Sequence, residues 1–220
     1  MAKEILTALQ KKFIALLAGN NQLKNQFYLS GGTALAAYYL HHRYSEDLDF
    51  FTTSEVDPMT INVFLKQIKT SLGIKKIDYQ LSFNRHLYFL HFTKGVLKTE
   101  FTYFPFEQTT KPALKDGIYI DSLIDIAVNK VFTIYQNPRS RDFIDLFFIL
   151  REDKTLTLPH LLKNARAKFD SQIDPLQWGT QLMKAQDISD LPRLIRPLEQ
   201  KTWREFFIAQ AKSQSKNIFQ

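Results

Sequence analysis

Residues 28–51 read YLSGGTALAAYYLHHRYSEDLDFF, and this stretch decides how the front of the chain folds. A short apolar segment ends in a Gly-Gly-Thr turn, helix-forming residues follow, and the stretch closes on a D-x-D and two phenylalanines. This order predicts a strand, a glycine-rich turn, a helix and a second strand. Residues two apart on a strand face the same way, so Asp47 and Asp49 project from one face of the sheet and Leu48 from the other.

The paired carboxylates allow two interpretations. Asp47 and Asp49 can be solvent-facing acids at a strand start, since aspartate is common in turns. Alternatively they hold a cation, because two parallel carboxylates repel each other unless a positive charge lies between them. Magnesium suits oxygen ligands and leaves part of its shell to water and phosphate. Gly31, Gly32 and Thr33 favour the metal interpretation, because a strand–glycine–helix turn offers backbone N–H groups to phosphate, although glycines also suit any tight turn.

A third acid, Glu100, interrupts the predicted strand LKTEFTYF at residues 97–104. Alternation places Lys98, Glu100 and Thr102 on one face of that strand. Lys98 and Glu100 can be ordinary exposed partners. Three carboxylates on two strands would also suit a two-metal phosphoryl-transfer site, in which one acid helps to deprotonate a hydroxyl.

Composition excludes several classes of site. The chain has 220 residues, 45% of them hydrophobic and 14% aromatic, which is enough to bury a core. It contains no cysteine, which excludes disulfides, cysteine-based zinc sites and thiol nucleophiles. The net charge of +7 favours phosphate-rich partners such as nucleic acid, although many basic proteins bind none. No G-x-x-x-x-G-K-[ST] motif is present, so the chain is not a P-loop enzyme.

The sequence predicts a soluble, cytoplasmic protein without a membrane partner. No apolar run approaches the roughly 20 residues of a membrane-spanning helix. The start, MAKEILTALQKKF, carries charges throughout and lacks the apolar region of a secretory signal.

Hydrophobic periodicity outlines the front half as an α/β region. The predicted strands cover residues 27–32, 47–52, 75–83, 86–93 and 96–104. The predicted helices cover residues 3–18, 33–42 and 57–73. Asn84-Arg85 and Lys94-Gly95 are predicted to be the tight turns between the last three strands.

The back half is predicted to be helical. Its helices are expected at residues 121–136, 139–152, 159–169, 175–186 and 199–213. The pattern therefore predicts an α/β core with an N-terminal helix over residues 1–110, and a helical region over residues 118–220.

The first two helices of the back half carry charges on their apolar faces. Lys130 lies among apolar residues on the 121–136 helix, where it can extend outward along its stem or point into a cleft and meet a triphosphate. Asp142 and Asp145 share a face of the next helix, and Arg141 can pair with Asp145 at i,i+4. The alternative is a salt-bridged helix pair that holds the two halves together.

Taken together, these motifs resemble the nucleotidyltransferase superfamily, with its G-[GS]-x(n)-D-x-[DE] pattern and a later lone acid. More narrowly, they resemble the AbiEii/AbiGii toxin family, a type IV toxin–antitoxin group of nucleotidyltransferases. The family pattern is matched by Gly31 to Leu35, His42, Arg43, Ser45, Asp47 to Phe51, Lys130, Arg139, Arg141, Asp142, Asp145 and Leu146. The resemblance covers residues 27 to about 150, and the last 70 residues carry no recognised motif.

The resemblance implies a nucleotidyltransferase-like mixed sheet flanked by helices, followed by a helical C-terminal half. It implies an NTP substrate and Mg²⁺, or Mn²⁺ in its place. Asp47, Asp49 and Glu100 would be catalytic metal ligands, and Lys130 would join them as a catalytic residue. The residues expected to bind the nucleotide are Gly31, Gly32, Thr33, Arg43, Ser45, Lys98, Arg141, Asp142 and Asp145.

The resemblance also implies a biological setting. The chain would be the toxin of a toxin–antitoxin or phage abortive-infection system, with a cognate antitoxin protein as a partner. Its acceptor would be RNA, with tRNA ends as the leading choice. Two alternatives stay open: a catalytically silent member that binds nucleotide, nucleic acid or a partner protein, and an aminoglycoside-type enzyme that modifies a small molecule.

Overall fold

The computed structural model describes residues 4–218, and the chain separates into two units. Unit 1 comprises the chain up to Tyr39 together with Ser45–Ser122. Unit 2 comprises Leu40–Tyr44 together with the chain from Leu123 onward. The sequence predicted a break between residues 110 and 118. The structure keeps the chain in unit 1 as far as Ser122 and assigns one short segment of the front half to unit 2.

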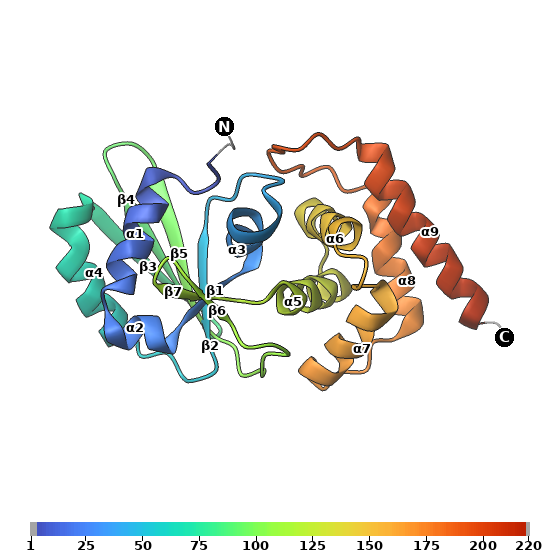
Figure 1. The fold of residues 1–220 in the computed structure, drawn as a ribbon, viewed down its shortest axis with the longest axis horizontal. Helices are drawn as coiled ribbons and strands as arrows, with labels where there is room; N and C mark the ends of the chain where they lie inside the picture. Colours follow the sequence, from blue (N-terminus) through green and yellow to red (C-terminus); the bar gives the residue numbers. More distant parts are fainter. Residues whose placement is uncertain (1–3, 219–220) are drawn as a thin grey trace. The chain divides into compact units, whose positions relative to one another are not determined.

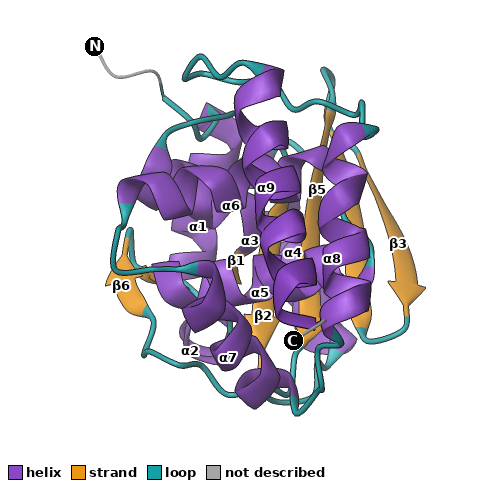
Figure 2. Cartoon of the chain, turned by 90° about the vertical axis from the view of Figure 1, so that its right-hand side faces the viewer, coloured by secondary structure: helices purple, strands orange, loops and turns teal. Residues whose placement is uncertain are grey.

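A seven-stranded sheet forms the centre of unit 1 (Figure 1). In chain order its strands are β1 (Tyr28–Ser30), β2 (Leu48–Thr52), β3 (Lys76–Ser82), β4 (Arg85–His91), β5 (Val96–Tyr103), β6 (Ala113–Lys115) and β7 (Ile118–Ile120). Their spatial order is β3-β4-β5-β2-β1-β7-β6, so β3 and β6 are the two edges (Figure 2). The five predicted strands are confirmed. Four have slightly shorter bounds, β4 starts one residue and ends two residues earlier than predicted, and β6 and β7 are additional.

The central strands run in mixed directions. β2 pairs antiparallel with β1 and parallel with β5, and β1 pairs parallel with β7. This register sets Ser30 beside Asp49, and Asp49 beside Glu100. Residues paired across neighbouring strands share a face, so three distant parts of the chain contribute side chains to one row.

The two faces of β2 differ as the alternation predicted. Leu48 and Phe50 are fully buried. The ring of Phe50 lies 6.2 Å from that of Phe13 on α1 (Ala8–Ala18), and Phe13 lies 5.9 Å from Phe64 on α4 (Pro58–Leu72). Helices α1 and α4 therefore cover this face of the sheet, as Figure 1 shows. Asp49 lies on the opposite face and is only partly buried.

Helix α1 begins later than predicted. Thr7 caps it by accepting a hydrogen bond from the backbone N–H of Gln10, and the Gln10 side chain accepts one from the N–H of Thr7. This capping box fixes the start of the helix after Thr7. Residues 4–7 are therefore not helical, although the pattern predicted a helix from residue 3. The first residue of that prediction lies outside the described chain. A short α2 (Asn21–Gln26), which was not predicted, follows.

The glycines of the Gly-Gly-Thr turn belong to a helix and not to the preceding strand. Helix α3 covers Gly31–Leu35 and continues directly as a π-helical segment, η1 (Ala36–Leu40). The predicted strand 27–32 was therefore too long at its C-terminal end, and the predicted helix 33–42 began too late. The cause is that Gly31 adopts a φ of 69°, which starts the turn immediately after Ser30.

The hairpin between β3 and β4 turns one residue earlier than predicted. Phe83 and Asn84 form the turn, with Phe83 at a φ of 54°. Arg85, which was predicted to belong to the turn, is the first residue of β4 and pairs with Thr102 of β5. Arg85 thus shares a sheet face with Glu100, since Thr102 lies two residues beyond it.

Helices make up most of the described part of unit 2, and residues 187–199 link the last two without regular helix or strand. Its helices are α5 (Leu123–Gln136), α6 (Ser140–Glu152), α7 (Leu158–Phe169), α8 (Pro175–Met183), the short 3₁₀ segment η2 (Lys184–Gln186) and α9 (Gln200–Ile218). The predicted helices are confirmed, with small differences at their ends. Both tryptophans of the chain, Trp178 and Trp203, are buried in this unit. Over residues 4–218, none of the helices has the length and apolarity required to cross a membrane.

Candidate active site

Two of the three predicted acids face each other across neighbouring strands. Asp49 of β2 is the register partner of Glu100 of β5. Asp47 immediately precedes β2, and its side chain is about one-third exposed (33%), whereas that of Glu100 is nearly buried (4%). The structure therefore places all three acids in unit 1, on strands β2 and β5 or next to them.

Two basic side chains neutralise these acids. Lys98 Nζ lies 2.9 Å from Asp47 Oδ2 and 3.9 Å from Glu100 Oε2. Arg85 binds Glu100 through two parallel bonds, Nε to Oε1 at 2.6 Å and Nη2 to Oε2 at 2.7 Å. Thr102 donates its hydroxyl to Glu100 Oε1 at 2.7 Å. Sequence reasoning missed Arg85, because the turn was placed one residue too late. A correct hairpin register would have found it.

The surroundings of Glu100 keep its carboxylate charged. Burial alone would raise the pKa of this carboxyl. The hydrogen bonds from Arg85 and Thr102, with the charges of Arg85 and Lys98, outweigh burial and hold the pKa below its ordinary value. Glu100 is thus ionised over the whole neutral range.

Gly31 lies directly against the carboxylate of Asp49. A Cβ atom added at Gly31 would stand 2.8 Å from Asp49 Oδ2, closer than such atoms approach each other in proteins. Gly31 also has a φ of 69°, which L-residues with a side chain rarely adopt. The first glycine of the motif is therefore required by the position of the acid as well as by the turn.

Thr33 and Ser45, both expected to bind the nucleotide, contact each other and the backbone. Thr33 is fully buried, and its hydroxyl lies 2.8 Å from Ser45 Oγ. The same hydroxyl donates to the backbone carbonyl of Asp47. These contacts tie the glycine-rich turn to the start of β2. Gly32, the second glycine, is partly exposed beside them.

The donor chemistry of the three acids suits a divalent metal, because carboxylate oxygens are the ligands that Mg²⁺ takes in proteins. Within residues 4–218, however, no three acidic or histidine side chains are gathered closely enough to hold a metal ion. Lys98 forms an ion pair with Asp47, and Arg85 forms one with Glu100. Each basic group therefore neutralises a carboxylate that a metal ion would otherwise neutralise. A metal held by this set would share the carboxylates with the two basic residues or replace them.

A second charged cluster lies in unit 2. Lys130 Nζ is 2.7 Å from Asp142 Oδ1 and 2.8 Å from Asp145 Oδ2, and its side chain is 10% exposed. Arg139 Nε adds a bond of 3.0 Å to Asp142 Oδ2. Lys130 therefore does not extend outward along its stem, which was one of the two possibilities that the helical pattern left open.

Asp145 also holds the His-Arg pair of the family motif. His42 Nε2 lies 2.7 Å from Asp145 Oδ1, and Arg43 binds both carboxylate oxygens at 2.6 and 2.8 Å. The predicted i,i+4 pair between Arg141 and Asp145 is wrong, because His42, Arg43 and Lys130 occupy the carboxylate. The arginine that forms an ion pair with Asp142 is Arg139, three residues before it in the chain.

Burial and charge act in opposite directions on the two aspartates of this cluster. Burial would raise the pKa of both carboxyls. The positive charge of Lys130 lowers the pKa of both carboxyls. Arg139 adds to this effect at Asp142 and Arg43 adds to it at Asp145, so both pKa values lie below that of an ordinary aspartate. The two aspartates are therefore ionised, and with Lys130 and Arg43 they form a buried network of two negative and two positive charges, to which the half-exposed Arg139 adds a third cation.

The family model described as nucleotidyl transferase AbiEii toxin, type IV TA system, matches residues 15–216. This chain belongs to the AbiEii family. The match extends the resemblance beyond residue 150, into the helices that carried no recognised motif. Both clusters of charged residues lie within the matched range.

Other proteins are similar to this AbiEii chain. An uncharacterised protein of Aquifex aeolicus is 34% identical over 129 residues, which are 58% of this chain and 59% of that protein. The chain thus matches about three-fifths of the length of this relative. A candidate nucleotidyltransferase from H. pylori is 19% identical, with a TM-score of 0.62 over 96% of this chain and 97% of that one. JHP933 from Helicobacter pylori is 18% identical, with a TM-score of 0.63 over 98% and 94%. At these identities the two structures demonstrate a shared fold.

The pH dependence of stability in this AbiEii chain should reflect His42. Burial lowers the pKa of His42 from its ordinary 6.5, and the bond to Asp145 restores only part of the shift. The unfolded chain therefore takes up a proton near pH 6.5 that the folded chain takes up only at lower pH. Stability falls as the pH drops below about 6.5 and keeps falling down to the pKa of the folded state.

Urea unfolding followed by tryptophan fluorescence, from about pH 8 to pH 5, measures this loss, because Trp178 and Trp203 both report on unit 2. His42→Gln keeps an N–H donor for Asp145 without titrating, so its profile should be flatter than that of the wild type. The exposed His160 is the matched control, and His160→Gln should follow the wild type. A His42→Gln profile that still follows the wild type would contradict this assignment.

Proposed function

We propose that this chain transfers a nucleoside monophosphate from a nucleoside triphosphate to the oxygen of an acceptor hydroxyl, which loses its proton, and that pyrophosphate is released. The observation that carries the proposal is the pairing of Asp49 with Glu100 on adjacent parallel strands, with Gly31 against the Asp49 carboxylate. This arrangement places a glycine-rich turn beside a row of acids, and a cation held by the acids would position a charged phosphate chain there. Membership of the AbiEii family supports the same activity.

The acids would hold the divalent metal that the family usually requires. Asp47, Asp49 and Glu100 are the residues for this role, with Mg²⁺ as the expected ion and Mn²⁺ as its substitute. When bound there, the metal would offset the phosphate charges and make the acceptor hydroxyl easier to deprotonate. The lowered pKa of Glu100 makes it a weak proton acceptor, so it suits the holding of a cation better than the removal of a proton.

Lys98 and Arg85 would move between the acids and the triphosphate. Their side chains are 26% and 48% exposed, and the charged group of each lies at the end of a long flexible stem. Without nucleotide they balance the charge of Asp47 and Glu100. With nucleotide they can turn to the phosphates, since basic side chains bind phosphate as readily as carboxylate.

The unit 2 residues expected at the nucleotide stay predictions. Lys130 and Arg43 are at present held by Asp142 and Asp145, and Arg43 is almost completely buried. These contacts favour a structural role for Lys130 and Arg43, in which their ion pairs stabilise the fold of unit 2. Arg141 is partly exposed and, among the described residues, forms no salt bridge, so it is the more accessible cation of this group.

For the acceptor we propose RNA, with tRNA ends as the leading choice. The net charge of +7 favours a polyanionic acceptor over an aminoglycoside, which is itself cationic. As a member of a type IV toxin–antitoxin family, the chain would act as a toxin and be countered by a cognate antitoxin.

The test incubates the protein with each labelled NTP, Mg²⁺ and total RNA, beside an Asp47→Asn/Asp49→Asn variant. We expect labelled RNA with the wild type and a loss of about a thousandfold in the variant, since the acids contribute several kcal/mol of charge stabilisation at the transition state. Asp78→Asn is the matched control, because Asp78 is an acid of the same sheet that pairs with Lys76 and His91, away from the three acids.

Each other outcome assigns the chain differently. Transfer that survives the double substitution would reject the proposed site. Transfer to an added aminoglycoside but not to RNA would support the small-molecule alternative. Tight NTP binding without transfer to either acceptor would identify a catalytically silent member.

A further inference from the structure

Three successive backbone carbonyls before β2 are held by side chains from elsewhere in unit 1. The Gln10 side-chain amide lies 3.1 Å from the carbonyl oxygens of both Ser45 and Glu46. Thr33 donates to the next carbonyl, that of Asp47. These three residues lie outside the strand, since the pairing of β2 with β5 begins at Leu48. Side chains thus replace the sheet as partners for this stretch of backbone.

We propose that Gln10 is a positioning residue for Asp47. Its amide would hold the segment that leads into β2, so that the first carboxylate of the D-x-D stays in register with the second. The proposal rests on the proposed function of the acids, because it assigns Gln10 to the support of that site.

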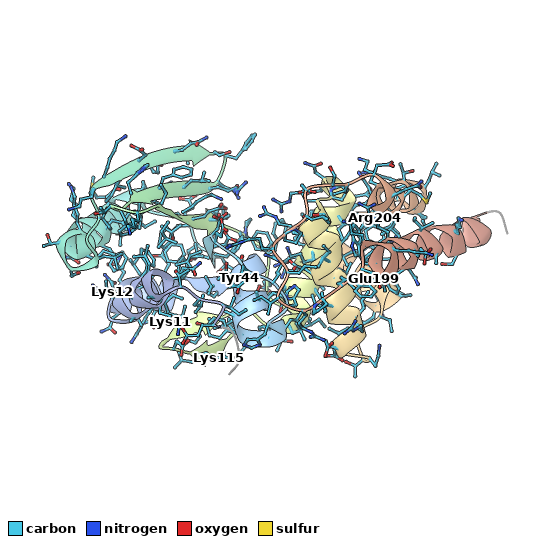
Figure 3. The ribbon with its side chains drawn as sticks, turned by 90° about the horizontal axis from the view of Figure 1, so that it is seen from above. Lys11, Lys12, Tyr44, Lys115, Glu199 and Arg204 are labelled. Carbon is cyan, nitrogen blue, oxygen red and sulfur yellow. The ribbon has the colours of Figure 1, made fainter. Side chains whose placement is uncertain are left out.

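The environment of Gln10 fits a dedicated role. Gln10 is 1% exposed, although it lies on a helix whose neighbouring Lys11 and Lys12 are exposed (Figure 3). Both polar groups of its side chain are paired: the oxygen accepts from the N–H of Thr7, and the NH₂ group donates to the carbonyls of Ser45 and Glu46. A buried amide with every group paired defines one arrangement of the chain around it.

Asp47 needs such support more than Asp49 does. Asp49 lies within β2, has a partner on each side in the sheet and abuts Gly31. Asp47 precedes the strand, and its carboxylate pairs with the ammonium group of Lys98, which lies at the end of a flexible stem. Among the described contacts, Thr33 holds the carbonyl of Asp47 itself, and Gln10 holds the carbonyls of the two residues before it.

A purely structural role for Gln10 is the alternative, because the same side chain completes the cap of α1. Two substitutions separate the roles. Gln10→Glu keeps an oxygen for the N–H of Thr7 but offers no donor to Ser45 and Glu46. Thr7→Ala removes the hydroxyl that caps the helix and leaves the Gln10 amide in place. Gln10→Met, which is neutral and of similar size, guards against unfolding caused by a buried charge.

The experiment measures two quantities that do not depend on transfer. Deuterium uptake of the peptide that covers residues 44–48 reports on the segment, and Mn²⁺ affinity without nucleotide, measured by electron paramagnetic resonance, reports on the acids. In both Gln10 variants we expect faster uptake and Mn²⁺ affinity weaker by about tenfold, as is usual when a group that orients metal ligands is lost. Thr7→Ala should match the wild type in both, although its melting temperature falls.

The turnover of the three variants completes the test. Gln10→Met should lower kcat more than it changes KM for the nucleotide, whereas Thr7→Ala should change neither. Unchanged uptake at residues 44–48 in both Gln10 variants would overturn the proposal, as would equal effects of Thr7→Ala. A wild-type chain that binds no Mn²⁺ and transfers no nucleotide would instead reject the proposed function, and the uptake of the segment would still decide whether Gln10 holds it.

Discussion

Gly31→Ala is expected to lower nucleotidyl transfer by about a hundredfold, the usual effect of a displacement near 1 Å at a reacting centre. The added Cβ would stand 2.8 Å from Asp49 Oδ2, so the carboxylate or the turn has to shift. Because the φ of 69° also disfavours alanine, the variant should lose about 1–2 kcal/mol of stability as well. Initial rates with saturating NTP, measured beside a urea unfolding curve, give both quantities.

Gly95→Ala is the control that separates the effect of backbone strain from the effect of displacing the Asp49 carboxylate. Gly95 has a φ of 84° in the hairpin between β4 and β5, and an added Cβ would meet nothing within 4 Å. Its alanine variant should therefore lose a similar amount of stability while keeping wild-type transfer. Equal transfer by the two variants at the same folded fraction would show that Gly31 serves the turn alone and does not make room for Asp49.

Asp145→Asn is expected to destabilise unit 2 by about 3–5 kcal/mol, the usual cost of removing one partner from a buried ion pair. The substitution keeps the shape of the side chain but leaves Arg43 and Lys130 buried beside a neutral group. Urea unfolding followed by tryptophan fluorescence measures the loss, because both tryptophans lie in unit 2.

An exposed ion pair of the same unit is the matched control. Glu152 pairs with Arg196 at 2.7 Å, with side chains 42% and 33% exposed. Glu152→Gln should leave the unfolding midpoint almost unchanged, because solvent screens such pairs. If Asp145→Asn behaved like this control, the buried network would not stabilise unit 2. Its charges would then be expected to function in ligand binding.

Local pattern was enough to predict the elements that carry the acids. Alternation around Asp47 and Asp49 placed Leu48 and Phe50 in the core, and both are buried. Helix α4 was predicted at residues 57–73. It is capped by Asp57 at one end and by Gly73, with a φ of 81°, at the other. These predictions succeed because the periodicity and the caps depend on neighbours a few residues away.

Other elements were beyond local pattern. Strands β6 and β7 have three residues each, too few to show a period, and they form because β7 pairs with the sequence-distant β1 and β6 pairs with β7. The early start predicted for α1 failed because Ile5 and Leu6 are apolar and buried without being helical. Hydrophobic spacing does not distinguish a helical turn from an extended segment that packs against the same core.

The sequence by itself determined which residues we propose for the chemistry: the Gly-Gly-Thr turn, the paired aspartates and the lone glutamate on a strand. Only the tertiary structure decided the partner of each charge. Arg85 meets Glu100 across a hairpin, Gln10 meets Ser45 from α1, and Arg43 meets Asp145 from 102 residues away. A periodic pattern records the face on which a side chain lies, because that depends on local backbone geometry. The partner depends on which distant segment the fold brings to that face, and no local pattern contains that information.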